Sequence, residues 1–465
     1  MRSKAGIAAA AILVAGWGVA LALSWPGHLS FDSIVQLHDG RTGFYHSWHP
    51  PAMAWLLGVF DAILPGTGLF ILLDSLLLLA AMLMVLAIAR RVSWAAAGVA
   101  ALCVLLPQFA LYQAVVWKDV LFADAAVAGF AALACAQACW GKLRARLAWI
   151  ALAFALLALA ALTRQNGVIV LGAGAVALVL IAPGRRIGLA YAGAALAGAM
   201  FVVFAASTML ARHSDDGEGP VAQLKILRLY DLIGAVAQDP SLPLDRLTDD
   251  APALERLIRS DGVRLYTPER NDTLVGSAPL QRELADAEPE WLAAQWSDLV
   301  RHHPWLYLKV RARVFAWVLL TPGAEGCRPI FTGVEGPAGE MEDLGLSPRR
   351  DARDLRLAAY GKAFMGTPAL SHVFFGVLAL AAMLLLLGRR APGDLALAAM
   401  QGAALLFTAS FFAISIACDY RYLYFLDAAA LAGAFALASD PAYLFHVSAM
   451  WSGSFWLFRS DDRKS

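Results

Sequence analysis

Charged and polar side chains that could do chemistry lie near the ends of long apolar runs of the sequence. The cations among them are Arg41, Lys118, Arg164 and Arg421, and all except Arg41 are within a few residues of such a run. The same loops contain Asp32, His38, His46, His49, Asp119, Asn166, Asp419 and Tyr422. A carboxylate can accept a proton from a hydroxyl, and Arg or Lys can bind an anionic group. The ordinary alternatives are side chains that snorkel to a membrane surface and salt bridges between neighbours.

The composition indicates a polytopic membrane protein. Of the 465 residues, 60% are hydrophobic and 16% are charged, whereas soluble domains have ~45–50% apolar and ~25% charged residues. This balance excludes a soluble enzyme, a disordered chain and a disulfide-rich scaffold. The formal net charge is +1, so the chain lacks the basic excess that would indicate binding to nucleic acid. Polar groups at membrane depth are costly, and the set above therefore indicates a functional site.

Apolar runs predict an all-α protein with about 10–12 transmembrane helices, since a helix needs ~17–25 residues to cross. The clearest runs are residues 5–23, 68–89, 94–112, 120–139, 147–162, 168–182, 187–210, 371–387, 395–417 and 422–438. The first also has the charge pattern of a signal peptide, but we interpret it as an uncleaved span because many spans follow. The run 51–64 is short and contains Asp61, so it suits an interfacial or re-entrant helix. The run 306–321 contains Lys309, Arg311 and Arg313 and suits the membrane interface, and 442–458 could lie flat or cross.

The distribution of Lys and Arg predicts which helix ends face the cytoplasm. Basic clusters alternate along the chain with loops that are poor in Lys and Arg, and the positive-inside rule places the clusters in the cytoplasm. The clusters are Arg2/Lys4, Arg90/Arg91, Lys142/Arg144/Arg146, Arg185/Arg186 and Arg389/Arg390. The loops 24–50, 113–119, 163–167, 212–365 and 418–421 then face outward, on the side that carries the polar set.

These boundaries predict three parts. Residues 1–210 form an N-terminal transmembrane module that carries the outer loop 24–50. Residues 211–365 form a mostly helical extracytoplasmic segment with an interfacial helix near 306–321. Residues 366–465 form a C-terminal transmembrane module and a short tail.

Four short motifs lie at the predicted outer ends. Asp32 follows the first span, and His49-Pro50-Pro51 opens the next apolar run, where the missing N–H of Pro51 needs no partner. The others are Trp117-Lys118-Asp119-Val120-Leu121-Phe122, Thr163-Arg164-Gln165-Asn166-Gly167 and Asp419-Tyr420-Arg421-Tyr422. Together the four resemble the motifs of the GT-C superfamily of membrane glycosyltransferases, which includes protein O-mannosyltransferases and lipid A aminoarabinose transferases. The sequence departs from that pattern at Ser33, where many relatives have a second acid, and at Ala52, where Leu is usual.

The resemblance implies a GT-C-like fold and the inverting transfer of a sugar from a polyprenyl-phosphate donor to a lipid, glycan or protein acceptor. It implies that Asp32 is the general base, and that Asp119 positions Lys118, binds an acceptor hydroxyl or ligates a metal. Lys118, Arg164 and Arg421 would bind the donor phosphate. Substrate would contact His49, Asn166 and Tyr422. The expected location is the bacterial cytoplasmic membrane, with the active site on the extracytoplasmic side, among membrane lipids and without a nucleic-acid partner.

Two questions about ligands and cross-links stay open in the sequence. The histidines of the first outer loop (His28, His38, His46 and His49) share it with Asp32 and Asp39, so a divalent metal is possible. Their spacing is not diagnostic, and we assign no metal ligand. Cys327 and Cys418 are both predicted near the outer side, where a disulfide is permitted but not established by the sequence.

Two other classes of function are compatible with the composition. A transporter or lipid flippase would also be polytopic, but that class favours ionisable residues near the bilayer midplane and two matching halves. A non-catalytic scaffold would use residues 212–365 to bind a partner, which leaves the polar loops unexplained.

Overall fold

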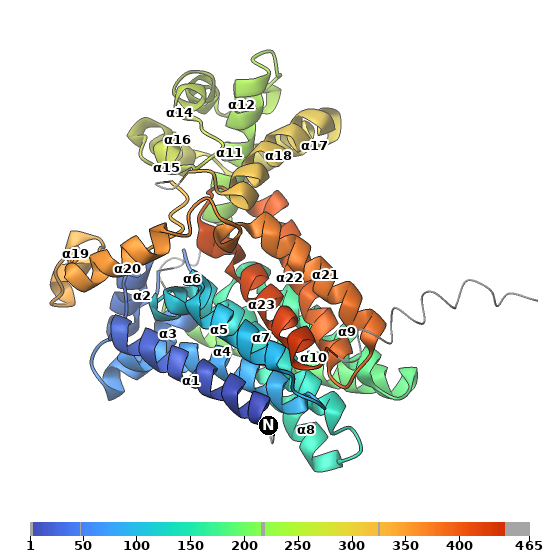
Figure 1. Ribbon diagram of the computed structural model, residues 1–465. Helices are drawn as coiled ribbons and strands as arrows, with labels where there is room; N and C mark the ends of the chain where they lie inside the picture. The colour runs from blue at the N-terminus through green and yellow to red at the C-terminus, as the bar shows by residue number, and fades with distance from the viewer. Residues whose placement is uncertain (1–2, 47, 215–218, 324–325, 442–465) are drawn as a thin grey trace, which may run out of the picture.

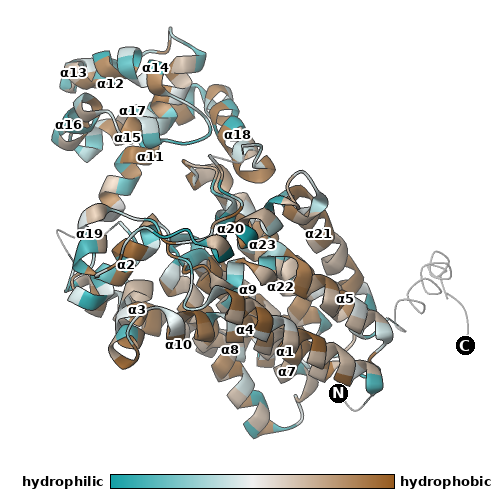
Figure 2. Ribbon diagram, turned by 60° about the vertical axis from the view of Figure 1, so that its left-hand side comes forward, coloured by the Kyte–Doolittle hydropathy of each residue, from teal (hydrophilic) through white to brown (hydrophobic). Residues whose placement is uncertain are grey.

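The structure is a computed structural model, and it describes residues 3–46, 48–214, 219–323 and 326–441. Within these ranges the secondary structure is helical, with isolated β-bridges and no strand. The helices form a large bundle, and a smaller helical lobe stands at one end of it (Figure 1). The bundle is mostly hydrophobic, whereas the lobe mixes hydrophilic and hydrophobic residues (Figure 2). These observations confirm the all-α polytopic class.

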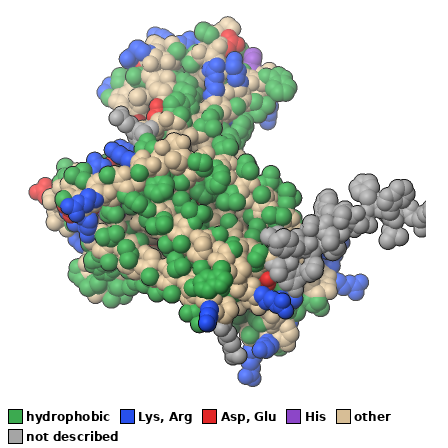
Figure 3. Space-filling view, in the orientation of Figure 1, with side chains coloured by type: hydrophobic (Ala, Val, Ile, Leu, Met, Phe, Trp, Pro, Cys, Tyr) green, Lys and Arg blue, Asp and Glu red, His purple; other side chains and the backbone are tan. Residues whose placement is uncertain are grey.

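By length and composition, 8 of the described helices could cross a membrane. They are α1 (Lys4–Ser24), α4 (Gly68–Ile88), α7 (Lys118–Ala138), α8 (Leu143–Thr163), α10 (Arg185–Ala211), α21 (His372–Arg389), α22 (Asp394–Ile414) and α23 (Tyr424–Ser439), which continues the 3₁₀ turn η5 (Tyr420–Leu423). Hydrophobic side chains form a broad belt over the visible face of the bundle (Figure 3).

Two of the expected spans take other forms. The run 94–112 forms α5 (Trp94–Leu105), α6 (Pro107–Ala110) and η1 (Tyr112–Ala114), which together are a candidate span bent by 62°. The bend falls at Pro107, because proline lacks the N–H that would continue the helix and forces Leu106 into an extended conformation. The run 168–182 forms α9 (Val168–Ile181), which has 14 residues and is short for a crossing.

The ambiguous runs form short helices where the structure describes them. Residues 51–64 form α3 (Ala52–Ile63), which packs against α2 (Phe31–Thr42) of the loop 24–50. The two helices touch backbone to backbone, because a Cβ at Gly40 would lie 2.2 Å from the carbonyl oxygen of Ala54. The run 442–458 lies outside the described residues.

The lobe has its own hydrophobic core, built from residues such as Leu229, Ile233, Leu292 and Val310. Its helices are α11 (Gly219–Gln238), α12 (Asp245–Asp250), α13 (Pro252–Leu257), the π-helical turn η3 (Ile258–Gly262), α14 (Val263–Leu265), α15 (Asp272–Val275), α16 (Ala278–Asp286), α17 (Pro289–His302) and α18 (Pro304–Leu320). The chain then returns through α19 (Ala338–Asp343), α20 (Ala352–Lys362) and η4 (Pro368–Leu370) to the bundle.

A buried arginine attaches the lobe to the bundle. Arg311 on α18 is fully buried, although its run was expected to lie at the membrane interface. Its Nη1 lies 2.9 Å from Oδ1 of Asp231 on α11. Its guanidinium also donates to the carbonyl oxygens of Phe412 and Ser415, at 2.7 and 2.9 Å. These carbonyls end α22 and lack helical partners, so Arg311 caps that span.

A disulfide makes a second attachment. Cys327 and Cys418 are bonded, with their Cα atoms 4.9 Å apart. The bond joins the loop after α18 to the turn before η5, and it answers the question that the sequence left open.

We expect Arg311→Met to lower the free energy of unfolding by about 3–5 kcal/mol, because the Asp231 carboxylate would stay buried without its cation. The double change Arg311→Met/Asp231→Leu should recover much of that loss. Unfolding in detergent, followed by intrinsic fluorescence, measures both. Arg313→Met, on the exposed side of α18, is the matched control. If Arg311→Met melts with the wild-type protein, the buried pair does not hold the lobe.

Candidate active site

The start of α2 is pinned to the segment that leads into α7. Ser30 is the N-cap of α2 and forms a capping box with Ser33. The indole N–H of Trp117 donates to Oγ of Ser30 at 2.8 Å, and Oγ of Ser33 donates to the carbonyl oxygen of Val116 at 2.6 Å. Asp32 therefore stands in the first turn of α2, next to the first turn of α7. The N-terminal end of a helix dipole favours a carboxylate at that position.

His49 lies between Asp32 and Lys118. Its Nδ1 is 2.6 Å from Nζ of Lys118, and its Nε2 is 3.8 Å from Oδ1 of Asp32. Burial, together with the charge of Lys118, lowers the pKa of His49 to about 4. The imidazole is therefore neutral near pH 7; its Nδ1 accepts from Lys118 and its Nε2–H faces Asp32.

Arg421 is the centre of the charged cluster. Its Nη2 lies 2.5 Å from Oδ2 of Asp32, and its Nε lies 3.7 Å from Oδ2 of Asp119. Burial alone would raise the pKa of Asp32, but the charge of Arg421 and the hydrogen bond with His49 outweigh it and hold that pKa well below its usual range. Asp32 is therefore an ionised carboxylate near pH 7.

Arg164 completes the cluster from the end of α8. It forms an ion pair with Asp119, which is buried behind Arg421. Its guanidinium also lies over the rings of Phe411 and Tyr422, 5.3 and 5.2 Å from their centroids. A cation over an aromatic face is stabilised by the ring quadrupole.

Of the eight side chains that the sequence singled out for the site, seven lie in or against this cluster. Asp32, His49, Lys118, Asp119, Arg164 and Arg421 are joined by the contacts above, and the ring of Tyr422 lies beneath Arg164. Asn166 instead donates to Oγ of Ser410 on α22 at 2.9 Å. It therefore fastens the loop after α8 to α22 beside the cluster.

A buried polar network holds the η5 turn from behind. The hydroxyl of Tyr420 donates to Oδ2 of Asp427 at 2.6 Å, and the hydroxyl of Tyr424 donates to the carbonyl oxygen of Gln108 at 2.8 Å. The Asp427 carboxylate also contacts Nδ1 of His372 at 2.9 Å. With Tyr420 and Tyr424 anchored in the bundle, Arg421 between them is held toward the cluster.

The cluster opens into a large cavity between the bundle and the lobe. The cavity has a volume of about 1030 Å³, and its bundle side includes Asp32, Trp117, Asp419 and Arg421. Its lobe side includes Arg270, Asn271, Asp272 and Gln281, and the loop after α18 adds Arg328, Phe331 and Glu335. Charged groups and aromatic rings thus face one space that is large enough for an extended ligand.

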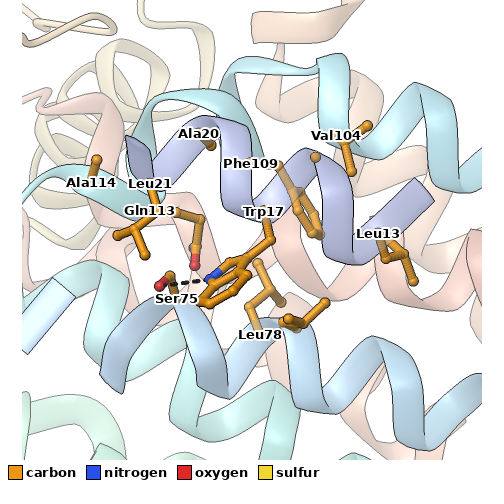
Figure 4. A pocket seen from close by; sticks show the side chains of 12 residues that line it. Leu13, Trp17, Ala20, Leu21, Ser75, Leu78, Val104, Phe109, Gln113 and Ala114 are labelled. Carbon is orange, nitrogen blue, oxygen red and sulfur yellow. Dashed lines mark hydrogen bonds between the residues drawn. The ribbon is translucent and has the colours of Figure 1, made fainter. Parts of the chain in front are cut away.

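A second pocket lies inside the bundle, between α1, α4, α5 and η1 (Figure 4). Its volume is about 20 Å³, and its lining is mostly apolar, with a hydrogen bond of 2.9 Å from the indole of Trp17 to Ser75. It has no charged side chain in its lining and room for little more than a water molecule, so the large cavity is the candidate site.

The four histidines of the loop 24–50 do not form a common ligand set. His28 accepts a hydrogen bond from the N–H of Gly333, His38 faces Asp343, and His46 faces Asp39. His49 belongs to the cluster described above. Among the described residues, the group of metal-type ligands that lies together is Glu269, Cys327 and Cys418, and its cysteines are in the disulfide. These residues do not fit a metal centre.

Sequence reasoning assigned no role to two charged residues at the site. Asp419 stands in a quoted motif, yet it was given no role, and its Oδ2 lies 3.2 Å from Nη2 of Arg421. Arg270 comes from the lobe, where no motif marks it, and its Nη1 lies 2.8 Å from Oδ1 of Asp419.

No family model matches this chain, and no curated protein matches it. Among solved structures, it is similar to the oligosaccharyltransferase AglB of Archaeoglobus fulgidus in complex with an inhibitory peptide and a dolichol-phosphate, with 14% identity, a TM-score of 0.39, and coverage of 98% of this chain and 52% of that one. The same archaeal enzyme with Zn and sulfate gives 16% identity, a TM-score of 0.42, and coverage of 94% and 50%.

ArnT from Cupriavidus metallidurans in the apo state is similar with 14% identity, a TM-score of 0.36, and coverage of 92% of this chain and 77% of ArnT. This chain spans about half the length of the archaeal oligosaccharyltransferase.

The neutral His49 predicts how stability depends on pH. In the unfolded chain a histidine binds a proton near pH 6.5, whereas the folded protein leaves His49 neutral down to about pH 4. Between these values the unfolded state binds more protons, so stability falls as the pH falls. From pH 7 to pH 5 we expect His49 to account for a loss of about 2 kcal/mol.

His49→Gln should therefore show a smaller decrease in melting temperature than the wild-type protein over that pH interval. His302→Gln, at an exposed position of the lobe, should show the wild-type decrease. If the melting temperature of His49→Gln decreased with pH as steeply as that of the wild-type protein, the imidazole of His49 would not be held neutral.

Proposed function

We propose that this protein transfers a sugar, with inversion, from a polyprenyl-phosphate donor to a hydroxyl of a lipid, glycan or protein acceptor. The observation that carries the proposal is the contact of 2.5 Å between Asp32 and Arg421 at the wall of the large cavity. It places a candidate base and a candidate phosphate-binding cation side by side, where the membrane helices meet the lobe. We also propose that the site faces the extracytoplasmic side of a bacterial cytoplasmic membrane.

The cations of the cluster suit the phosphate of the donor. Arg421 reaches the cavity, and Lys118 and Arg164 lie behind it in the same cluster. An arginine can hold a phosphate through two parallel hydrogen bonds. When the sugar–phosphate bond breaks, the departing phosphate gains negative charge, and fixed cations stabilise that change without reorganising. We therefore assign Arg421 to the donor phosphate, with Lys118 and Arg164 supporting its field.

Asp32 suits the role of general base. It would take the proton of the acceptor hydroxyl as that oxygen forms a bond to the anomeric carbon, while the bond to the phosphate oxygen breaks on the opposite side of the sugar. In the unliganded protein Arg421 makes Asp32 a weak base. When the guanidinium turns its hydrogen bond toward the donor phosphate, the carboxylate loses that partner and becomes more basic. Donor binding would thus prepare the base.

The transport alternative would draw on ionisable groups inside the spans, and Asp74 on α4 and Asp124 on α7 are of that kind. Asp124 accepts a hydrogen bond of 2.7 Å from Gln113, which also donates to the hydroxyl of Tyr424. These contacts belong to the packing of the bundle, and neither aspartate lines the large cavity. Sugar transfer is therefore the function that the charged cavity supports better.

We expect Asp32→Asn to reduce transfer by at least about 100-fold, because a positioned general base typically contributes 10²–10⁴-fold. The assay uses protein purified in detergent and a panel of polyprenyl-phosphate sugars, with release of the sugar from the lipid as the readout. Asp61→Asn is the matched control, because Asp61 also pairs with an arginine, Arg41, at 2.8 Å but lies outside the large cavity. A folded Asp32→Asn protein with wild-type turnover would remove the proposed base.

A further inference from the structure

Backbone hydrogen bonds fasten the turn that carries Arg421. The backbone of Arg270 pairs with that of Ala417 in an antiparallel bridge, and the N–H of Asn271 donates to the carbonyl oxygen of Ile416 at 3.0 Å. On the other side, the N–H of Tyr420 donates to the carbonyl oxygen of Cys327 at 2.8 Å, next to the disulfide. Residues 416–420 are thus held between the lobe segment 270–271 and the loop that follows α18.

The side chain of Arg270 adds a contact with the charged cluster. Its Nη1 lies 2.8 Å from Oδ1 of Asp419 and also donates to the carbonyl oxygen of Gly326. The other oxygen of Asp419 lies 3.2 Å from Nη2 of Arg421. One carboxylate therefore stands between two guanidinium groups, one from the lobe and one from the bundle.

The charges around Arg421 show how the guanidinium of Arg270 affects it. Asp32, Asp119 and Asp419 all contact Arg421. Asp119 has Arg164 as a further partner, and Asp32 faces His49. Asp419 has Arg270. Without Arg270, the full charge of Asp419 would act on Arg421 in a partly buried place, where such interactions are strong, and would compete with an incoming anion.

We propose that Arg270 is a positioning residue for anion binding by Arg421: it engages the carboxylate of Asp419 and so leaves Arg421 available to the phosphate of a lipid carrier. The inference rests on the proposed function, in which Arg421 receives that phosphate. It also gives the lobe a part in the donor site, because a lobe residue sets how strongly a bundle residue binds.

The test is the equilibrium binding of undecaprenyl phosphate, a lipid monophosphate without sugar, to the full-length protein in nanodiscs. We expect Arg270→Gln to raise the Kd about tenfold, the effect of weakening one charge-assisted hydrogen bond. Asp419→Asn removes the competing charge and should bind within about threefold of the wild-type protein. The decisive variant is Arg270→Gln/Asp419→Asn, which should bind like Asp419→Asn alone.

If Arg270 had only a structural role, the double variant would bind as weakly as Arg270→Gln, because removing the charge of Asp419 could not restore the affinity. Arg270→Lys keeps the charge and should lose less affinity than Arg270→Gln. Arg246→Gln is the matched control, since Arg246 is another lobe arginine that pairs with a carboxylate, Asp298 at 3.3 Å, but it lies outside the large cavity. It should bind like the wild-type protein.

Wild-type affinity in Arg270→Gln, or a double variant as weak as Arg270→Gln, overturns the inference. If Arg270→Gln does not fold, Arg270→Lys and the double variant decide by the same criteria, and failure of the double variant to fold counts against the inference. Arg421→Gln separates the two proposals. If Arg421→Gln binds undecaprenyl phosphate as tightly as the wild-type protein, the proposed donor site fails and the inference fails with it. The same holds if the wild-type protein binds no undecaprenyl phosphate. If Arg421→Gln loses affinity and Arg270→Gln does not, the positioning inference alone is wrong.

Discussion

Charged side chains at the ends of apolar helices need partners, and the ion pair between Asp32 and Arg421 meets that need across 389 positions of the chain. An uncompensated charge in such a place is costly, so each cation and each carboxylate of the cluster faces an opposite charge or a polar group. The loop 24–50, the start of α7, the end of α8 and the η5 turn must therefore converge. The large cavity lies at this convergence, and Asp32, Asp419 and Arg421 line its wall.

The lobe is attached to the bundle by a buried arginine and by a disulfide. Arg311 caps the end of α22 and pairs with Asp231, and the disulfide joins the loop after α18 to the turn before η5. Both attachments lie close to Arg421 along the chain. The position of the lobe and the position of Arg421 are thus fixed by the same few residues, and a lobe residue, Arg270, also lines the large cavity.

Much of this arrangement could be predicted from the sequence because its signals are local. Apolar length predicted the helices, and polar residues at the outer ends of several spans predicted the cluster of Asp32, Lys118, Asp119, Arg164 and Arg421. The helix α2 also had a local signal, the Ser30–Ser33 capping box, which sequence reasoning did not use. The bend at Pro107 is likewise a local effect that hydropathy alone does not reveal.

Other features depend on tertiary contacts that no local pattern encodes. Arg270 lies 149 positions from Asp419, in a segment with many other charged residues, and only the packed lobe brings the two together. Asn166 turns to Ser410 because α9 packs against α22, and Arg311 is buried because α18 docks on the end of α22. In each case the sequence shows a polar residue, whereas its partner is chosen by how the helices pack.

The most direct test of the central claim is an experimental structure of the protein in nanodiscs with bound undecaprenyl phosphate. The account places the phosphate group within hydrogen-bonding distance of the guanidinium of Arg421, with the Asp32 carboxylate facing the same cavity. A phosphate bound away from Arg421, or Asp32 and Arg421 at opposite ends of the membrane helices, would contradict it.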